Sequence, residues 1–352
     1  MLKRFSPTMS RRITIEDVAR HAGVGKVTVS YVLNGRSKDA RISEETAQRI
    51  LSVAKELQYR PNAIARMLVT RRTDTLAVLF QSGSYFTAWS GFTSEVMRGI
   101  SEATVEEGCD LLMHTKHMKD ADEEADALAD GRVDGALVLR DEHDPTFLKL
   151  IEKQFPCVQF FTHNDGLDVP WVDCDNVLGG RLATDHLISQ GHKRIAMVRG
   201  AGGSVSSNDR VAGFRKSMLE AGLPVREEWM IVQSDPSGSM AEVLKIFESK
   251  DRPTAVFVWS DDVALPIMRG LRGAGLRVPQ DVSIVGFDSS VAAETAEPAL
   301  TSVRQPIREM AAAATHLLIS IVRKRDIENR QVLIRPSLDV RSSTASLRRQ
   351  LS

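Results

Sequence analysis

From Thr75 onward, short apolar runs alternate with longer helical stretches, and this alternation constrains the fold more than any other feature of the chain. The helical stretches include Glu95–Glu107, Val177–Gln190 and Val211–Ala221. Strands that alternate with helices form parallel, doubly wound sheets with helices on both faces. About 260 residues of this pattern fit two such lobes better than one. The strand-like runs are Leu76–Phe80, Leu111–His114, Gly135–Leu139, Cys157–Phe161, Ile195–Val198, Ala255–Val258 and Ser283–Gly286.

The part of the chain before this pattern differs from the rest in charge. The first 72 residues contain 15 lysines and arginines against six acidic residues, a net charge of +9, although the 352-residue chain is neutral overall. The remainder therefore carries −9. A small basic head on a larger acidic body predicts a polyanion-binding module joined to a different kind of domain. A merely solvated basic surface is the alternative, which charge alone does not exclude.

Several classes of protein are excluded by composition. With 42% hydrophobic residues the chain can form real cores, and its three cysteines, Cys109, Cys157 and Cys174, lack the spacing of a disulfide framework or a zinc site. No apolar run approaches the ~20 residues of a membrane span. The basic segment Met1–Arg12 has no apolar region behind it and does not resemble a secretory signal. We therefore expect a cytoplasmic protein with no membrane contact, metal or cofactor.

The head has the signature of a helix-turn-helix. Thr14 can cap a first helix that Gly23 ends, Lys26–Asn34 forms a second helix, and Ser43 can cap a third. Two short helices joined at a glycine turn are typical of this DNA-binding motif. The side chains expected to pack between the helices are Ile15, Val18, Ala19, Ala22, Val29, Val32, Leu33, Ala47, Ile50, Ala54 and Leu57.

The segment ITIEDVARHAGVGKVTVSYVLNG (Ile13–Gly35) resembles the DNA-binding head of the lactose-repressor (LacI/GalR) family, as do RISEETAQRI (Arg41–Ile50) and YRPNAIARML (Tyr59–Leu68). The resemblance implies that the second helix enters the major groove. Gly25 replaces a serine that is common in the family, so the second helix should lack a side-chain cap. Val27 can pack in the head as well as contact a thymine methyl. By position, the base contacts would be Lys26, Val27 and Tyr31, and the phosphate contacts Thr14, Thr28, Ser30, Asn34 and Arg41.

A hinge segment follows the head. Pro61 ends the preceding structure, Asn62 can cap a new helix, and Ala63–Leu68 allows only about two turns, which are marginal in isolation. The resemblance implies that this helix forms when two copies meet in the minor groove, with Asn62 and Leu68 at the DNA and Leu68 wedged into a base step. Packing of Leu68 on the body is the alternative.

The body resembles the effector domain of the same family, a periplasmic-binding-protein fold whose two lobes close on a small molecule. The matching segments are Asp175–Gly200, Arg210–Phe214 and Leu276–Asp288. The resemblance places Arg210 and Asp288 at the effector, where a guanidinium and a carboxylate can bracket vicinal hydroxyls. An interlobe salt bridge between the two is the alternative. The further effector positions are Ser260, Phe161 and Trp89.

The expected organisation is a basic tail (1–12), a helix-turn-helix domain (13–60), a hinge and linker (61–72), a body (73–344) and a tail (345–352) without the heptads of a tetramer-forming coiled coil. Within the body, one lobe should contain about 73–173 and 304–335, and the other about 174–303 and 336–344.

The predicted function is that of a sequence-specific transcription regulator, expected to be a repressor. It would act as a homodimer on a pseudo-palindromic operator under allosteric control by a small molecule, most simply a sugar. Two alternatives stay open: a nucleotide or sugar enzyme, for which Gly200–Gly203 offers only an incomplete dinucleotide fingerprint, and a sugar receptor without a DNA role.

Overall fold

The chain divides into two compact units, Met1–Thr73 and Asp74–Ser352. A computed structural model describes residues 13–60, 67, 72–81, 91–141, 144–164, 166–200, 204–233 and 238–347. Among these residues, no helix is long and apolar enough to span a bilayer.

The head unit consists of three helices with the predicted caps: α1 (Ile15–Ala22), α2 (Lys26–Leu33) and α3 (Glu44–Glu56). Thr14 and Asp17 form a reciprocal capping box, and Gly23 ends α1 with a φ of 65°. The Ser43 hydroxyl accepts a hydrogen bond from the Thr46 amide, whereas α2 has no side-chain cap, as predicted. The shared core contains Val18, Ala19, Ala22, Val29, Val32, Ala47, Ile50 and Ala54, with Ile15, Leu33 and Leu57 packed against it.

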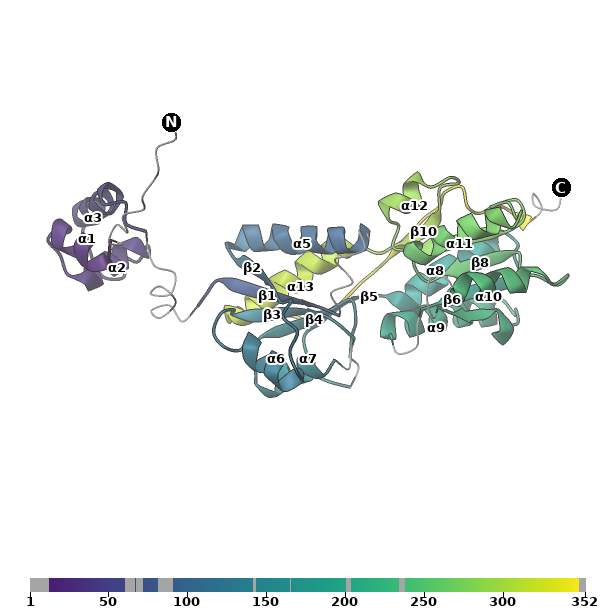
Figure 1. Cartoon of the computed structure of the whole chain (residues 1–352), viewed down its shortest axis with the longest axis horizontal. Coiled ribbons are helices and arrows are strands. Elements are labelled where there is room, and N and C mark those ends of the chain that lie inside the picture. The colour runs from purple at the N-terminus through teal and green to yellow at the C-terminus, as the bar shows by residue number, and fades with distance from the viewer. Residues whose placement is uncertain are drawn as a thin grey trace, which may run out of the picture. The chain divides into compact units, whose positions relative to one another are not determined.

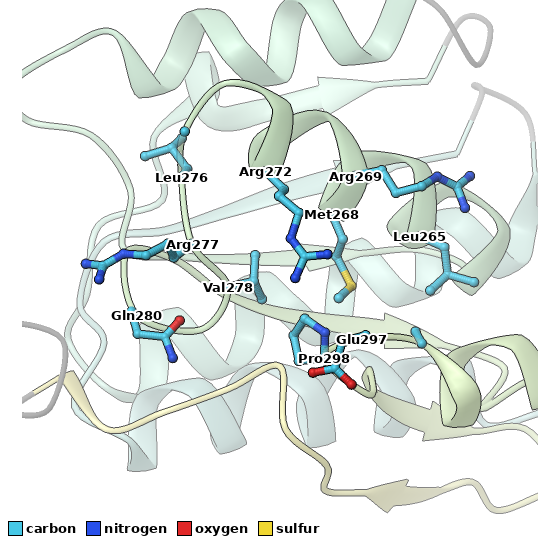
Figure 2. Close-up of a pocket in the computed structure, with 12 residues that line it drawn as sticks. Leu265, Met268, Arg269, Arg272, Leu276, Arg277, Val278, Gln280, Glu297 and Pro298 are labelled. Atoms are coloured by element: carbon cyan, nitrogen blue, oxygen red, sulfur yellow. The ribbon is translucent and has the colours of Figure 1, made fainter.

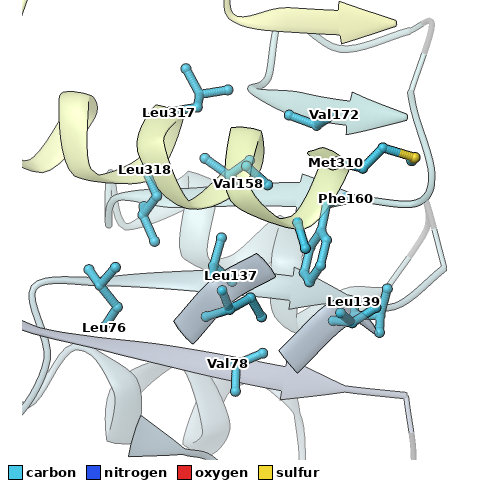
Figure 3. Packing of buried hydrophobic residues seen from close by; sticks show 14 of the residues in the cluster. Leu76, Val78, Leu137, Leu139, Val158, Phe160, Val172, Met310, Leu317 and Leu318 are labelled. Atoms are coloured by element: carbon cyan, nitrogen blue, oxygen red, sulfur yellow. The ribbon is translucent and has the colours of Figure 1, made fainter. Parts of the chain in front are cut away.

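The first lobe of the body is a parallel six-stranded sheet in the order β11-β5-β4-β3-β1-β2. Helices α5 (Gly91–Glu107) and α13 (Ile307–Val322) cover one face, and α6 (Ala121–Leu128) and α7 (Pro145–Glu152) belong to the other. Figure 3 shows α13 lying over the strands, with Leu318 and Met310 above Val158 and Phe160. The strands are β1 (Thr75–Phe80), β2 (Asp110–Met113), β3 (Gly135–Leu139), β4 (Cys157–Phe160), β5 (Trp171–Cys174) and β11 (Gln331–Ile334).

The second lobe also has a six-stranded sheet, in the strand order β12-β10-β9-β8-β6-β7. Figure 1 shows the strands of this lobe covered by helices. Its core clusters place α10 (Gly238–Phe247) and α11 (Asp261–Gly273) on one face, and α8 (Asn176–Ser189) and α9 (Val205–Glu220) on the other. A short helix, α12 (Val291–Thr295), and a 3₁₀ turn, η2 (Glu227–Trp229), complete the lobe. The strands are β6 (Ile195–Arg199), β7 (Met230–Val232), β8 (Ala255–Val258), β9 (Ser283–Phe287), β10 (Thr301–Arg304) and β12 (Ser337–Asp339).

The structure corrects the sequence prediction in three respects. The second sheet is not wholly parallel, because β12 pairs antiparallel with β10 at the sheet edge. Helix α9 begins six residues before the predicted start, so Arg210 lies inside a helix. Five strands were missed, namely β5, β7, β10, β11 and β12, each only three or four residues long. Such short segments contain few alternations, and strands such as β10 (TSVR) and β12 (SLD) also lack the apolar run that marked the similarly short β4 and β8.

The residues after β12 are tied to the second lobe. The Ile284 amide donates to Ser343 O at 2.9 Å, and the Leu347 amide donates to Gln190 O at 3.0 Å. His192 is fully buried, with Nδ1 3.0 Å from Thr254 Oγ1 and Nε2 3.1 Å from Ala345 O. Residues 345–347, expected as part of a tail, therefore contribute to the body.

Candidate DNA-binding head and effector site

Helix α2 presents the predicted base-reading positions on its outer surface. Val27 is 64% exposed, and Lys26 is exposed with its Nζ 3.3 Å from Glu16 Oε1. Tyr31, one turn after Val27, is half-buried. Val27 does not pack in the core of the head, and its contact with a base stays a prediction.

Several of the predicted phosphate contacts already form hydrogen bonds with nearby residues of the head. The Thr14 hydroxyl donates to Asp17 Oδ2 at 2.8 Å within the capping box. The Asn34 side-chain amide donates to Ser30 O at 2.8 Å. Thr28 and Ser30 are half-buried, and Arg41 is exposed at a φ of 52°. Asn62 and Leu68 lie outside the described residues.

In the body, Arg210 owes its position to a close crossing of α8 and α9. A Cβ on Gly180 would lie 2.3 Å from Arg210 O, and one on Gly213 would lie 2.2 Å from Val177 O. Only glycine permits this separation of the two helix backbones. A Cβ on Gly179 would likewise lie 2.6 Å from the Phe287 ring. The glycines at 179, 180 and 213 therefore bring Arg210 against Phe287.

The Arg210 guanidinium is buried and fully oriented by the protein. Its Nε donates to Asn176 Oδ1 at 2.9 Å, one Nη donates to Trp259 O, and the other donates to Gln305 Oε1 at 3.2 Å. Its Cζ lies 3.5 Å from the centroid of the Phe287 ring. Burial lowers the pKa of Arg210, and the carboxyl group of Asp288 acts in the opposite direction. An arginine keeps its charge in such surroundings, so these contacts hold a cation in place.

Two of these partners lie where the chain crosses between the lobes. Asn176 begins α8 directly after β5 of the first sheet, and Gln305 lies between β10 of the second sheet and α13 of the first lobe. Arg210 therefore ties together two of the segments that connect the lobes. A ligand that contacted Arg210 would therefore contact a side chain that is bonded to both of these segments.

Asp288 directly follows β9 at a φ of 106°, an unusual backbone for a side-chain-bearing residue. Its amide donates to Val303 O at 2.8 Å. Part of the residue is open, yet desolvation of its carboxyl group raises its pKa well above the usual range, and Arg210 opposes that shift. Such a carboxyl group has acceptor capacity that hydroxyl groups of a ligand could use.

The alternative of an interlobe salt bridge is wrong on two counts. Arg210 in α9 and Asp288 after β9 belong to the same lobe, and no ion pair joins these two described residues.

Ser260 is buried at the start of α11, beside Trp259, and its side chain does not cap that helix. The next residue, Asp261, is structural: it accepts hydrogen bonds from Ser302 Oγ at 2.6 Å and from the Ser290 amide at 2.7 Å. Burial raises the pKa of Asp261 to about 6, against these hydrogen bonds. Ser260 therefore lies near Arg210, because the carbonyl of the preceding residue, Trp259, accepts a hydrogen bond from Arg210.

Phe161 belongs to the first lobe, at the end of β4. Its φ is 62°, and its ring packs edge-on against Phe92 of α5 with centroids 4.9 Å apart. Its carbonyl accepts a hydrogen bond from Ser206 Oγ of α9 at 3.0 Å, so the two lobes touch here. Trp89, the remaining predicted effector residue, lies outside the described residues.

Sequence reasoning missed a polar chain beside this contact. His163 Nδ1 lies 2.8 Å from Asp173 Oδ2, and the Asn176 side-chain amide lies 3.4 Å from Asp173 Oδ1. Asp173 is fully buried, and burial raises its pKa although His163 opposes the shift. The chain continues through Asn176 to Arg210. Asn176 stands in the segment matched to the family, which was the one available signal.

A hollow of about 470 Å³ lies elsewhere, on the surface of the second lobe. Met268 and Arg272 extend from α11 toward Glu297 and Pro298 (Figure 2). None of the predicted effector residues lines this hollow; its lining residues are Leu265, Met268, Arg269, Arg272, Gly275, Leu276, Arg277, Val278, Gln280, Ala296, Glu297 and Pro298.

Comparison with known families identifies both parts of the chain. Residues 14–62 match the model described as "Bacterial regulatory proteins, lacI family". Residues 184–344 match the model described as "Periplasmic binding protein-like domain".

Curated relatives extend the similarity over nearly the whole length. The chain is 35% identical over 341 residues to the HTH-type transcriptional regulator CelR of Thermobifida fusca, covering 95% of this chain and 98% of the relative. It is 32% identical over 342 residues to the HTH-type transcriptional repressor PurR of Aliivibrio fischeri, with the same coverage.

Solved structures agree with the fold. A transcriptional regulator CelR–cellobiose complex is 33% identical, with a TM-score of 0.72 over 94% of this chain and 100% of that one. A lac repressor dimer bound to operator and an anti-inducer shows the same fold at 24% identity, with a TM-score of 0.81 over 95% and 100%. The chain belongs to the LacI family of bacterial regulatory proteins and is a DNA-binding transcription regulator, not an enzyme.

Proposed function

We propose that this regulator is a repressor that binds a pseudo-palindromic operator as a homodimer and is controlled by a carbohydrate. The observation that carries the proposal is the pairing of an exposed recognition surface on α2 with an oriented Arg210 that also holds the segments between the lobes. A ligand at Arg210 would favour one lobe arrangement, and thereby change operator affinity. The division of the body into lobes, as expected from the sequence, is supported by the membership of the two sheets.

A polyhydroxyl effector fits the chemistry of the site. The buried guanidinium keeps N–H groups beyond its three protein bonds, and Asp288 offers acceptor oxygens. The partly exposed rings of Phe161 and Trp259 can pack against the apolar face of a sugar. The relative whose solved structure contains cellobiose is 33% identical. Ser260 and Trp89 complete the proposed set of contacts.

Isothermal titration of the full chain with cellobiose, other disaccharides, monosaccharides and nucleotides tests the effector class. We expect a saccharide to bind, and Asp288→Asn to weaken that binding at least tenfold while the fold is retained. Binding of a nucleotide and of no saccharide would overturn the carbohydrate assignment.

At the DNA, we propose that Lys26, Val27 and Tyr31 face base edges, and that Thr14, Thr28, Ser30, Asn34 and Arg41 contact phosphates. Asn62 and Leu68 would act in the minor groove. The protein would act in the cytoplasm, where the DNA is. Footprinting on genomic fragments should reveal a protected site with twofold sequence symmetry. Leu68→Ala should weaken binding and reduce DNA bending; unchanged bending would remove the wedge role.

The hollow on α11 supports the homodimer. Its floor includes Met268 and Val278, and its rim carries Arg269, Arg272 and Glu297, none of which forms an ion pair with another described residue. Because both signs occur on one patch, a twofold-related copy could set arginine against glutamate twice.

Sedimentation equilibrium of charge-reversed variants tests this surface. Arg272→Glu and Glu297→Arg should each shift the protein toward monomer, and the double variant should recover the dimer. A dimer unaffected by either reversal would place the interface elsewhere.

A further inference from the structure

Arg36, which lies just beyond α2, is held in place by three separate contacts. Its backbone amide donates to Tyr31 O at 2.8 Å, and its Cζ lies 5.6 Å from the centroid of the Tyr31 ring. Its Nε donates to Asp39 Oδ2 at 3.1 Å. The Arg36 side chain is nevertheless 56% exposed. The guanidinium is therefore both accessible and oriented.

No such combination occurs at the other ion-paired cations of the described head. Arg20 pairs with Asp17 at 2.6 Å and Lys26 with Glu16 at 3.3 Å, and neither lies over an aromatic ring. A ring beneath a guanidinium fixes the plane of the fork, and a carboxylate at Nε fixes its rotation. Arg36 thus loses less freedom on binding than a cation held by one carboxylate.

The contacts also join Arg36 to the recognition surface. Val27 and Tyr31 are four residues apart on α2 and so share one face of the helix. The Tyr31 ring lies against the Arg36 guanidinium, and the Tyr31 carbonyl accepts a hydrogen bond from the Arg36 amide. The face proposed to meet base edges therefore continues past the end of the helix to a fixed guanidinium.

We propose that Arg36 reads a guanine in the major groove of each operator half-site, with the Tyr31 ring and Asp39 as its support. This inference rests on the proposed DNA-binding surface. With Nε bound to Asp39, the two Nη atoms remain to donate to O6 and N7 of guanine, the commonest specific contact of an arginine with a base.

The neighbouring cations provide the contrast. Lys38 and Arg41 are exposed in the same turn, and neither side chain has a hydrogen-bond or ion-pair partner among the described residues. A mobile point charge suits a phosphate, which tolerates many directions of approach. A fixed fork suits a base edge.

The test starts with selection of an operator by the full-length wild-type protein from a randomised duplex pool. Binding is then measured on that operator and on every single base-pair substitution of it, at two salt concentrations. The proteins compared are wild type, Arg36→Ala, Arg36→Lys, Asp39→Asn and, as a matched neighbouring control, Lys38→Ala.

We expect Arg36→Ala to lose roughly 5- to 150-fold discrimination at one G·C pair in each half-site and to keep its discrimination elsewhere. Arg36→Lys should fail in the same way, because an ammonium cannot form the fork. Asp39→Asn should lose part of that discrimination. Lys38→Ala should weaken all duplexes alike and lower the salt slope by about one.

Two results would overturn the inference while leaving the proposed function intact. In the first, Arg36→Ala weakens binding to all duplexes by the same factor, as expected of a phosphate contact. In the second, Arg36→Lys distinguishes the operator from its single base-pair substitutions as well as the wild type does. If the wild type selected no duplex at all, the proposed operator binding would fail first, and the inference with it.

Discussion

The proposed recognition surface of the head and the proposed effector site of the body are built in opposite ways. In the head, proposed contacts such as Thr14 and Asn34 are placed by residues three or four positions away, in the Thr14–Asp17 box and the Asn34–Ser30 bond. In the body, Arg210 is placed by residues 34, 49 and 95 positions away. Damage to one helix cap should therefore affect the head locally, whereas damage to one helix crossing should disturb the whole effector site.

The tryptophans make this contrast measurable. All four, Trp89, Trp171, Trp229 and Trp259, lie after residue 73, so their fluorescence follows the body and not the head. Peptide-resolved hydrogen exchange can follow the head in the same sample.

The largest effect is expected from Gly180→Val. A side chain there would meet the Arg210 carbonyl, since even a Cβ would lie 2.3 Å from it. We expect the free energy of body unfolding to fall by about 3 kcal/mol or more in urea, with head exchange unchanged. Gly273→Ala is the control, because nothing lies within 4 Å of its Cβ. Equal losses in the two variants would contradict the close crossing.

Arg210→Ala is expected to cost the body about 2–4 kcal/mol, because Asn176, Trp259 and Gln305 each lose a hydrogen-bond donor. Effector binding should disappear. Arg215→Ala, on the same helix but in an exposed pair with Glu227, should cost under about 1 kcal/mol. A stable Arg210→Ala body would show that the buried contacts contribute little.

Acidification should destabilise the body through His192. Burial lowers the pKa of this imidazole in the fold, whereas the unfolded chain titrates near 6.5. The unfolded state thus takes up the proton first, and this contribution to stability declines as the pH falls below about 6.5.

Burial raises the pKa values of Asp173 and Asp288, and these groups therefore stabilise the fold as the pH falls. The contribution of His192 is isolated by comparing the wild type with His192→Gln, which leaves both carboxyl groups in place. The free energy of unfolding, measured in urea by tryptophan fluorescence, should fall less steeply between pH 7.5 and pH 5 in that variant than in the wild type. Parallel pH profiles would exclude His192 as a source of the dependence.

The smallest effect is expected in the head. Ser43→Ala removes the hydroxyl that caps α3 and should cost about 1 kcal/mol, seen as faster amide exchange in α3 alone. Ser52→Ala, on an exposed position of the same helix, is the control and should be nearly neutral. A shift in the tryptophan-monitored transition would show that the two units are more tightly coupled than the comparison assumes.

Elements with strong local signals were predicted well. The three head helices, their caps and the strands at 135–139 and 255–258 agree with the structure within a residue or two. Short polar strands such as β10 and β12 were missed, because pairing with a distant strand supplies what their own pattern lacks.

The sequence proposed Arg210 and Asp288 as effector contacts, and these stay predictions, whereas the contacts that position Arg210 were not predicted. Arg210 and Asp288 were found by resemblance, and the salt bridge weighed for them does not exist in the structure. Asn176 and Phe287 lie in segments that resemble the family and Gln305 does not, but nothing in the sequence showed that these three residues hold Arg210, since contacts across dozens of residues leave no periodicity. All the DNA and effector contacts stay predictions, and Asn62, Leu68 and Trp89 lie outside the described residues.

The sequence by itself determined where helices begin and end, because caps such as Ser43 and stops such as Gly23 act on amides within a few residues. It also determined the separation of a basic head from an acidic body. Only the tertiary structure decided that Arg210 faces Phe287 and bonds to two of the segments that cross between the lobes, because those contacts exist only after α8 and α9 pack across their glycines. Short-range hydrogen bonds can be read along a chain, whereas a buried site is a property of the assembled sheets.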